Sequence, residues 1–166
     1  MTANPSFRIG HGFDLHRLAV GHRLIVGGVY IEHELGCDAH SDGDVVFHAV
    51  TDAVLGGLGQ DDLGKLFPDS DPAWNGVDSS LFVKEAARRM SVADFTVGNL
   101  DVTVILQRPK LADHKQAICA NLAKLLGCTS SQVNVKGKTH EQVDALGEGK
   151  AIACHTVVLL NKNSEH

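Results

Sequence analysis

The stretch Asn99–Gln107, with the sequence NLDVTVILQ, decides the fold class because apolar and polar residues alternate along it. Its even-numbered residues, from Leu100 to Leu106, are all apolar, and four of its five odd-numbered residues are polar. A period of two predicts a strand that buries one face in a core. Pro109 follows closely and is expected to end the strand, since proline has no backbone N–H to donate.

Helices are predicted on both sides of this strand. Residues 81–90 and 113–126 carry apolar residues at helical spacing, and Gly127 stands where a glycine commonly ends a helix. A third helix is predicted over residues 43–58, with Ser41 as its N-cap and Asp44 as the capping-box partner.

Four further strands are predicted, at residues 7–11, 24–31, 133–136 and 151–160. No internal repeat is present along the chain. The order of strands and helices predicts an α+β fold, in which a mixed β-sheet carries helices on one face. We expect one domain over residues 1–166, a length that suits a single hydrophobic core.

The composition excludes several classes of protein. Of the 166 residues, 43% are hydrophobic and 21% are charged, and the formal net charge is −5. Lysines and arginines are not clustered, so we expect no nucleic-acid partner. No apolar run is long enough to span a bilayer, and the N-terminus lacks the pattern of a signal peptide, so we expect no membrane partner. Four cysteines without a C-x-x-C pair predict reduced thiols in the cytoplasm.

The segment Gly12–His16 carries a candidate pair of metal ligands. In extended backbone, residues i and i+2 project to the same face, so Asp14 and His16 are expected to point the same way. Phe13 and Leu15 then point the other way, towards apolar surroundings.

His48 offers a third ligand from the predicted helix 43–58. Asp44 and Asp52 lie four residues to either side of it, so the three side chains share one face of the helix. Valines occupy the opposite face. We therefore expect a helix that buries its valines and exposes a polar stripe.

One carboxylate and two imidazoles, from Asp14, His16 and His48, suit zinc. Three protein ligands leave the fourth position open, as a catalytic zinc requires. The spacing alone leaves other histidines in competition with these ligands: His11, His22, His33 and His40.

Other segments have the composition of phosphate-binding sites. The helix start at His40–Asp44 offers free backbone N–H groups, although simple capping explains the same residues. Residues 62–71 form a long polar loop, which fits either a functional loop or a solvated linker.

Gly137, Lys138 and Thr139 resemble the end of a P-loop, but Gln132 stands where the first glycine is required, so a P-loop is rejected. A turn near Gly137 can still hold a phosphate, and Glu141 is an oxygen ligand of the kind that magnesium prefers.

Motifs in order along the chain resemble those of a known family. They are RIGHGFDLH at 8–16, AHSDGD at 39–44 with His48, DLGKLFPD at 62–69, DVTV at 101–104, PK at 109–110 and VNVK at 133–136. Together they cover nearly the whole chain and resemble the 2-C-methyl-D-erythritol 2,4-cyclodiphosphate synthase family.

This resemblance implies a lyase of the non-mevalonate route to isoprenoids. Its substrate would be 4-diphosphocytidyl-2-C-methyl-D-erythritol 2-phosphate, whose 2-phosphate attacks the β-phosphorus of the same molecule. The products would be CMP and 2-C-methyl-D-erythritol 2,4-cyclodiphosphate. The resemblance also implies a chorismate-mutase-like homotrimer, with sheets around the threefold axis and active sites between subunits. The protein would be cytoplasmic in a bacterium, or plastid if a transit peptide was removed.

The resemblance further implies a role for particular residues. Asp14, His16 and His48 would hold zinc, Glu141 would hold magnesium or manganese, and Thr139 would touch the diphosphate. Contacts at the nucleotide end would come from Leu106, Lys110, Leu111, Ala112, Gly137, Lys138 and Thr139. Contacts at the erythritol end would come from His40, Ser41, Asp62, Leu63, Gly64, Phe67, Pro68, Asp69, Ser70 and Asp71.

One segment departs from the family pattern. Family members often read Gly-Arg-Gly-Glu-Gly before the last strand, whereas this chain reads GEGKA at residues 147–151. In the family this region lines a cavity on the trimer axis where an isoprenoid diphosphate has been proposed to bind. Glu148 would repel such a ligand, so we expect weak or absent binding. Alternatively, Glu148 and Lys150 form an ion pair with swapped partners.

Two other classes of protein share these features. A non-catalytic, zinc-containing module would bind cytidine nucleotides without turnover. A metal-dependent phosphohydrolase would release inorganic phosphate, with Asp44 or Asp52 as the base that activates water.

Overall fold

The computed structural model describes residues 6–68 and 70–163. In chain order, the elements are β1 Phe7–Val20, β2 Leu24–Val26, β3 Val29–Ile31, β4 Leu35–Asp38, α1 Val45–Gly57, α2 Leu63–Leu66, η1 Pro72–Trp74, α3 Ser80–Val92, β5 Phe95–Ile105, α4 Lys115–Leu126, η2 Ser130–Gln132, β6 Val133–Lys138, α5 Asp144–Gly147 and β7 Ala151–Lys162.

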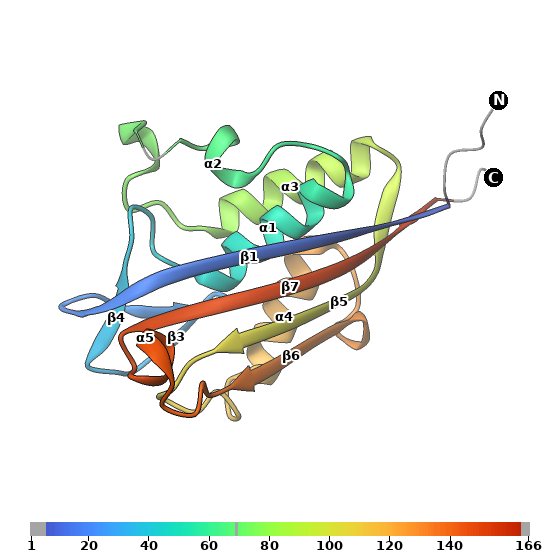
Figure 1. Ribbon diagram of the computed structural model, residues 1–166. Helices are drawn as coiled ribbons and strands as arrows, with labels where there is room; N and C mark the ends of the chain where they lie inside the picture. The colour runs from blue at the N-terminus through green and yellow to red at the C-terminus, as the bar shows by residue number, and fades with distance from the viewer. Residues whose placement is uncertain (1–5, 69, 164–166) are drawn as a thin grey trace.

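A five-stranded mixed sheet forms the centre of the molecule, with the strand order β4-β1-β7-β5-β6. The pair β5–β6 is parallel, and the other neighbouring strands are antiparallel. The long helices α1, α3 and α4 lie together on one face of this sheet (Figure 1). The predicted α+β class and the one-sided helical layer are therefore confirmed.

The alternation predicted for Asn99–Gln107 is present in β5. Leu100, Val102 and Val104 are fully buried beneath the helices, whereas Asp101 and Thr103 are only half-buried on the other side. We call this helix-free side the open face. Its exposed side chains include seven from β1 and β7: Phe7, Ile9, His11, Phe13, Leu15, His155 and Val157.

Two glycines bring α1 directly onto β1. A Cβ atom at Gly10 would lie 1.8 Å from the carbonyl oxygen of Ala53, and one at Gly12 would lie 1.8 Å from that of Ala49. Only a residue without a side chain fits at either position, because the obstacle is helix backbone. The close approach places the N-terminal half of α1 over the strand residues that follow Gly12.

The predicted strand 24–31 is in fact a hairpin, and the predicted cap of α1 was wrong. Gly27 and Gly28 form the turn between β2 and β3 with φ of 58° and 75°. Asp44, rather than Ser41, is the N-cap of α1. One carboxylate joins the two features, since it accepts N–H bonds from both turn glycines and from two helical residues, Val46 and Phe47. Local patterns could not reveal this contact between separate segments.

The predicted exposure of α1 was also wrong. The helix is buried on nearly every side, and Asp44 is fully buried while His48 is only 6% exposed. Conversely, Phe13 and Leu15 are each 48% exposed, so one chain does not provide the apolar surroundings expected for them.

The four cysteines carry free thiols, as predicted. Cys37 and Cys154 are buried, and this burial raises the pKa of each thiol to about 12. Within the described ranges, no helix has the length and apolar character needed to cross a membrane.

Candidate active site

Asp14, His16 and His48 meet at one point, as the sequence predicts. Asp14 Oδ2 lies 2.9 Å from both His16 Nε2 and His48 Nδ1, and the two imidazole nitrogens are 3.0 Å apart. Asp14 and His16 come from the same face of β1, and His48 comes from α1. The strand spacing and the close packing of α1 at Gly12 together create this triangle.

Hydrogen bonds alone do not satisfy such a triangle. If both imidazoles donate to Asp14, two N–H groups face each other across 3.0 Å. If one imidazole gives up its proton, only two of the three pairs can be hydrogen-bonded. A cation among the three atoms would satisfy all of them at once. The three separations are close to the value of about 3.3 Å expected for nitrogen ligands around one tetrahedral zinc ion.

The electrostatics of the triangle also fit a cation. Burial opposes ionisation of Asp14, but hydrogen bonds with His16 and His48 outweigh it and lower the pKa of the carboxyl group. Burial alone would lower the pKa of His48, yet its hydrogen bond with Asp14 and the negative charges nearby raise it. The carboxylate is therefore ionised at neutral pH, as a metal ligand must be.

The triangle lines a cavity of about 330 Å³. Five of the residues predicted for the erythritol end line the same cavity: His40, Ser41, Leu63, Gly64 and Phe67. Within the described part of the chain, His40 Nε2 is buried and has no hydrogen-bond partner. A buried polar atom of this kind is suited to contact a ligand.

A second cavity, of about 300 Å³, lies between the end of β5, the start of α4 and β6. All seven residues predicted for the nucleotide end line it: Leu106, Lys110, Leu111, Ala112, Gly137, Lys138 and Thr139. Leucine side chains provide an apolar wall, and lysines provide positive charge. This combination suits a base attached to phosphates.

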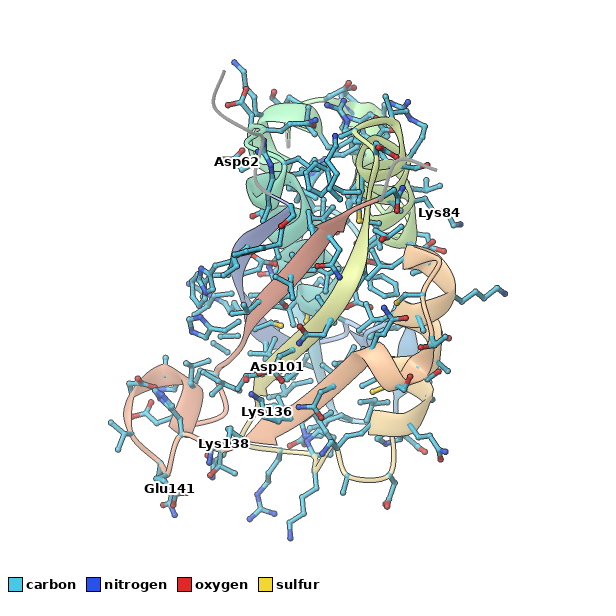
Figure 2. All side chains as sticks on the ribbon, turned by 90° about the vertical axis from the view of Figure 1, so that its right-hand side faces the viewer. Asp62, Lys84, Asp101, Lys136, Lys138 and Glu141 are labelled. Carbon is cyan, nitrogen blue, oxygen red and sulfur yellow. The ribbon has the colours of Figure 1, made fainter. Side chains whose placement is uncertain are left out.

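The two cavities share no lining residue and lie apart in one chain. We call the cavity lined by the triangle the metal cavity and the second one the nucleotide cavity. Asp62 precedes Leu63, which lines the metal cavity, and lies near the top of Figure 2, whereas Lys138 and Glu141 lie at the bottom. Glu141 lies beyond β6 and accepts a hydrogen bond of 3.0 Å from Thr139 Oγ1. The predicted nucleotide and metal contacts are therefore not brought together within one chain.

Some of the predicted erythritol contacts are not placed in the metal cavity. Asp62 instead caps α2 by accepting the N–H of Lys65, and Asp71 caps η1. Pro68 and Ser70 do not line the cavity either. Asp69 lies outside the described residues. A polar loop pattern does not distinguish residues that cap short helices from residues that contact a ligand.

Sequence reasoning missed several residues around the site. Phe82 packs on the ring of His48, and Trp74 and Phe67 continue the aromatic wall of the cavity. Ser79 contacts His48 from the start of α3. Their patterns look like an ordinary core face and an ordinary helix start, so nothing in the sequence alone singles them out.

Three of the four competing histidines lie elsewhere, and the fourth, His40, lines the same cavity without joining the triangle. His11 contacts His155, His22 lies near Asp38, and His33 bonds the backbone of Leu35, so none of the three joins the triangle. The two bases that a phosphohydrolase would need, Asp44 and Asp52, do not line the metal cavity. Asp44 accepts four backbone N–H bonds, and Asp52 accepts one from Leu63.

In the segment that departs from the family pattern, Lys150 Nζ lies 2.5 Å from Glu148 Oε2. The alternative of a swapped ion pair is therefore present in the structure. Both side chains are more than half exposed, so the pair adds little stability.

The chain is similar to known proteins over most of its length. Residues 7–161 match the model of the YgbB family. A chloroplastic 2-C-methyl-D-erythritol 2,4-cyclodiphosphate synthase of Arabidopsis thaliana is 62% identical over 97% of this chain and 70% of its own length. A 2-C-methyl-D-erythritol 2,4-cyclodiphosphate synthase of Pectobacterium atrosepticum is 52% identical over 93% of this chain and 94% of its own length. This chain spans 66–70% of the length of three plant relatives.

Solved structures show the same fold. The CDP complex of Plasmodium falciparum IspF is 37% identical, with a TM-score of 0.85 over 97% of this chain and all of that chain. Since sequence and fold match over nearly the whole chain, the chain belongs to the YgbB family, the family of the 2-C-methyl-D-erythritol 2,4-cyclodiphosphate synthases.

Proposed function

We propose that this chain performs its family's reaction at a site that two subunits complete. The family reaction forms 2-C-methyl-D-erythritol 2,4-cyclodiphosphate in the non-mevalonate route to isoprenoids, as a phosphorus–oxygen lyase. One subunit contributes the metal cavity, and its neighbour contributes the nucleotide cavity. The observation that carries the proposal is the division of one set of predicted contacts between two separate cavities.

The open face supports association of subunits, and the family resemblance implies that there are three. Phe7, Ile9, Phe13, Leu15 and Val157 are each between 45% and 64% exposed there, and they lie on two paired strands. Exposed apolar patches of this kind mark protein interfaces. Association through the open face would supply the apolar surroundings that Phe13 and Leu15 lack in one chain.

The donor set of Asp14, His16 and His48 fits zinc. Glu141 would hold magnesium or manganese, which prefer oxygen ligands of its kind. When bound, these cations supply Lewis-acid stabilisation of the charge on the diphosphate. The protein residues do the positioning. His40 Nε2 donates to an oxygen of the erythritol phosphate end, and Thr139 contacts the diphosphate. Lys110 and Lys138 offset the charge of the departing CMP.

The reaction is intramolecular, so holding the substrate in the right shape is the main task of the site. A phosphate oxygen of the substrate is already an anion, and no general base is needed to activate it. Well-oriented intramolecular reactions gain about 7–11 kcal/mol over bimolecular ones. Two cavities that grip the two ends of the substrate provide that orientation, and fixed positive charge stabilises the transferring phosphoryl group.

The direct test is incubation of the protein with 4-diphosphocytidyl-2-C-methyl-D-erythritol 2-phosphate and divalent metal, followed by mass analysis. We expect CMP and the cyclic diphosphate in equal amounts. Release of inorganic phosphate would instead indicate a phosphohydrolase, and bound but unchanged substrate would indicate a non-catalytic nucleotide-binding module.

Two variants test the roles of the metal ligands. His48→Ala is expected to abolish turnover while the oligomer stays intact, and activity above about a tenth of the parent's would contradict a ligand role. Glu141→Gln is expected to weaken the dependence on magnesium more than the zinc content. Glu34→Gln, at another exposed glutamate, serves as the matched control.

A further inference from the structure

The hydroxyl group of Ser79 does not cap the helix that it begins. Ser79 is the N-cap residue of α3, and a serine there normally accepts a backbone N–H from the first turn. Its side chain makes no such bond, although the residue is fully buried. Its Oγ lies 2.9 Å from His48 Nε2 and within hydrogen-bonding distance of Asp42 Oδ1.

Asp42 holds Ser79 at two points. Its Oδ2 accepts the backbone N–H of Ser79 at 3.1 Å, while Oδ1 accepts the hydroxyl. A carboxylate only accepts, so the single proton of the Ser79 hydroxyl points to Asp42. The oxygen of Ser79 then faces His48 as an acceptor.

This direction determines the tautomer of His48. Because the Ser79 oxygen that faces Nε2 is an acceptor, Nε2 must carry a proton. In the neutral ring the lone pair is then on Nδ1. Nδ1 is the atom that faces Asp14 and His16. Ser41 Oγ lies 3.1 Å from Nε2 and 3.3 Å from Ser79 Oγ. Since the Ser79 proton points to Asp42, the Ser41 hydroxyl can donate to Ser79 and turn its own oxygen to Nε2 as a second acceptor.

We propose that Asp42 and Ser79 are positioning residues, which hold His48 in the Nε2-protonated tautomer so that Nδ1 is ready to bind the metal ion. The proposal rests on the proposed metal centre and deepens it. Partners that orient a metal-binding histidine in this way commonly change metal affinity or activity by about 10–100-fold when they are removed.

The test compares Ser79→Ala with Ser80→Ala, which makes the same change one residue further along α3. The side chain of Ser80 lines a different cavity, between α1, α3 and α4. Zinc affinity is measured by competition with a chelator of known affinity. We expect Ser79→Ala to weaken zinc binding by about 10–100-fold and Ser80→Ala to leave it unchanged. Equal affinity in Ser79→Ala and the parent would overturn the proposal.

A second pair of variants separates the hydroxyl from packing and charge. Ser79→Thr keeps a hydroxyl and is expected to keep most of the affinity, whereas Asp42→Asn removes the charge and is expected to weaken binding. If Ser79→Thr loses as much affinity as Ser79→Ala, packing at this position matters rather than the hydroxyl, and the proposal fails.

The tautomer itself can be read by nitrogen-15 NMR of the histidine rings. We expect a protonated Nε2 at His48 with slow solvent exchange in the zinc-loaded parent, and faster exchange of that proton in zinc-loaded Ser79→Ala. Equal exchange rates in the two zinc-loaded proteins would contradict the proposal. Neither measurement requires turnover. Absence of synthase activity would therefore count against the proposed function and not against the positioning role of Asp42 and Ser79.

Discussion

At the scale of single residues, Gly12 links the packing of the fold to the metal site. A side chain there would meet the backbone of α1, which cannot move aside as a flexible side chain could. We expect Gly12→Ala to destabilise the protein by about 3 kcal/mol or more, at or beyond the upper end for overpacked cores. Urea unfolding measures the loss, and zinc content should fall because His48 is displaced from Asp14.

Gly56 provides the matched control on the same helix. A Cβ at Gly56 would have no neighbour closer than the carbonyl oxygen of His11, at 3.8 Å. Gly56→Ala is therefore expected to stabilise the protein by about 0.5–1 kcal/mol, the usual difference between the two residues within a helix. Equal effects of the two substitutions would contradict the packing argument.

Glu148 is expected to prevent tight binding of isoprenoid diphosphates. Lys150 is already paired with Glu148, so its charge is not free for a phosphate. Calorimetry with farnesyl diphosphate should show no saturable binding to the parent, and Glu148→Gln should bind more strongly because the repulsion is gone. Tight binding by the parent would contradict this prediction.

At the scale of elements, Asp44 joins α1 to the β2–β3 hairpin. Its carboxylate accepts four N–H groups, and burial raises its pKa to about 6 despite these bonds. Asp44→Ala leaves four donors without their acceptor, each at a cost of about 1–3 kcal/mol when buried. We expect a loss of at least 3 kcal/mol in urea unfolding, by the same estimate.

The control for this prediction is Asp78→Ala. Among the described residues, the side chain of Asp78 accepts one N–H, that of Ser80, at an exposed position before α3. Its loss should cost about 1 kcal/mol or less, since water can replace the bond. Similar losses in both variants would show that Asp44 acts as an ordinary surface cap.

The elements with a clear period could be predicted from sequence. The alternation of β5 and the spacing of α4 depend on one face of one element, which a local pattern records. The hairpin at Gly27 and Gly28 and the cap at Asp44 have local signals that our prediction did not use, because Gly-Gly commonly forms a two-residue turn and aspartate is a common N-cap. The bonds from the turn to Asp44 could not be predicted, because they join segments 16 or 17 residues apart.

The candidate site divides in the same way. Asp14 and His16 follow from strand spacing, but spacing alone did not choose His48 over the other histidines, and the family motifs did. Ser79 and Phe82 act through their contacts with His48. The sequence around a serine or a phenylalanine at the start of a helix does not record which residue lies beside it in the fold, so these two contacts could not be predicted.

At the scale of the whole molecule, the open face predicts the state of association. We expect the protein to sediment at three times the chain mass of 17.7 kDa. Val157→Glu places a charge in the apolar part of the open face and should yield monomers that bind zinc but do not turn over substrate. A parent that sediments as a monomer would contradict the shared active site.

Val92→Glu is the control for this substitution. Val92 is 76% exposed at the end of α3, away from the open face. It should leave both the mass and the activity unchanged. If Val157→Glu also stays trimeric, another surface holds the subunits together.

Strand β1 carries the candidate metal ligands and the apolar residues of the open face on opposite sides of one backbone. Asp14 and His16 face α1, while Phe13 and Leu15 face outward. Inserting one residue before Phe13 would turn the following side chains over and exchange the two sets. We therefore expect the gain or loss of one codon here to disrupt the candidate metal site and the proposed subunit contact together. Descendants of this sequence should vary freely in the composition of the strand, within its alternating pattern, but hardly in its length.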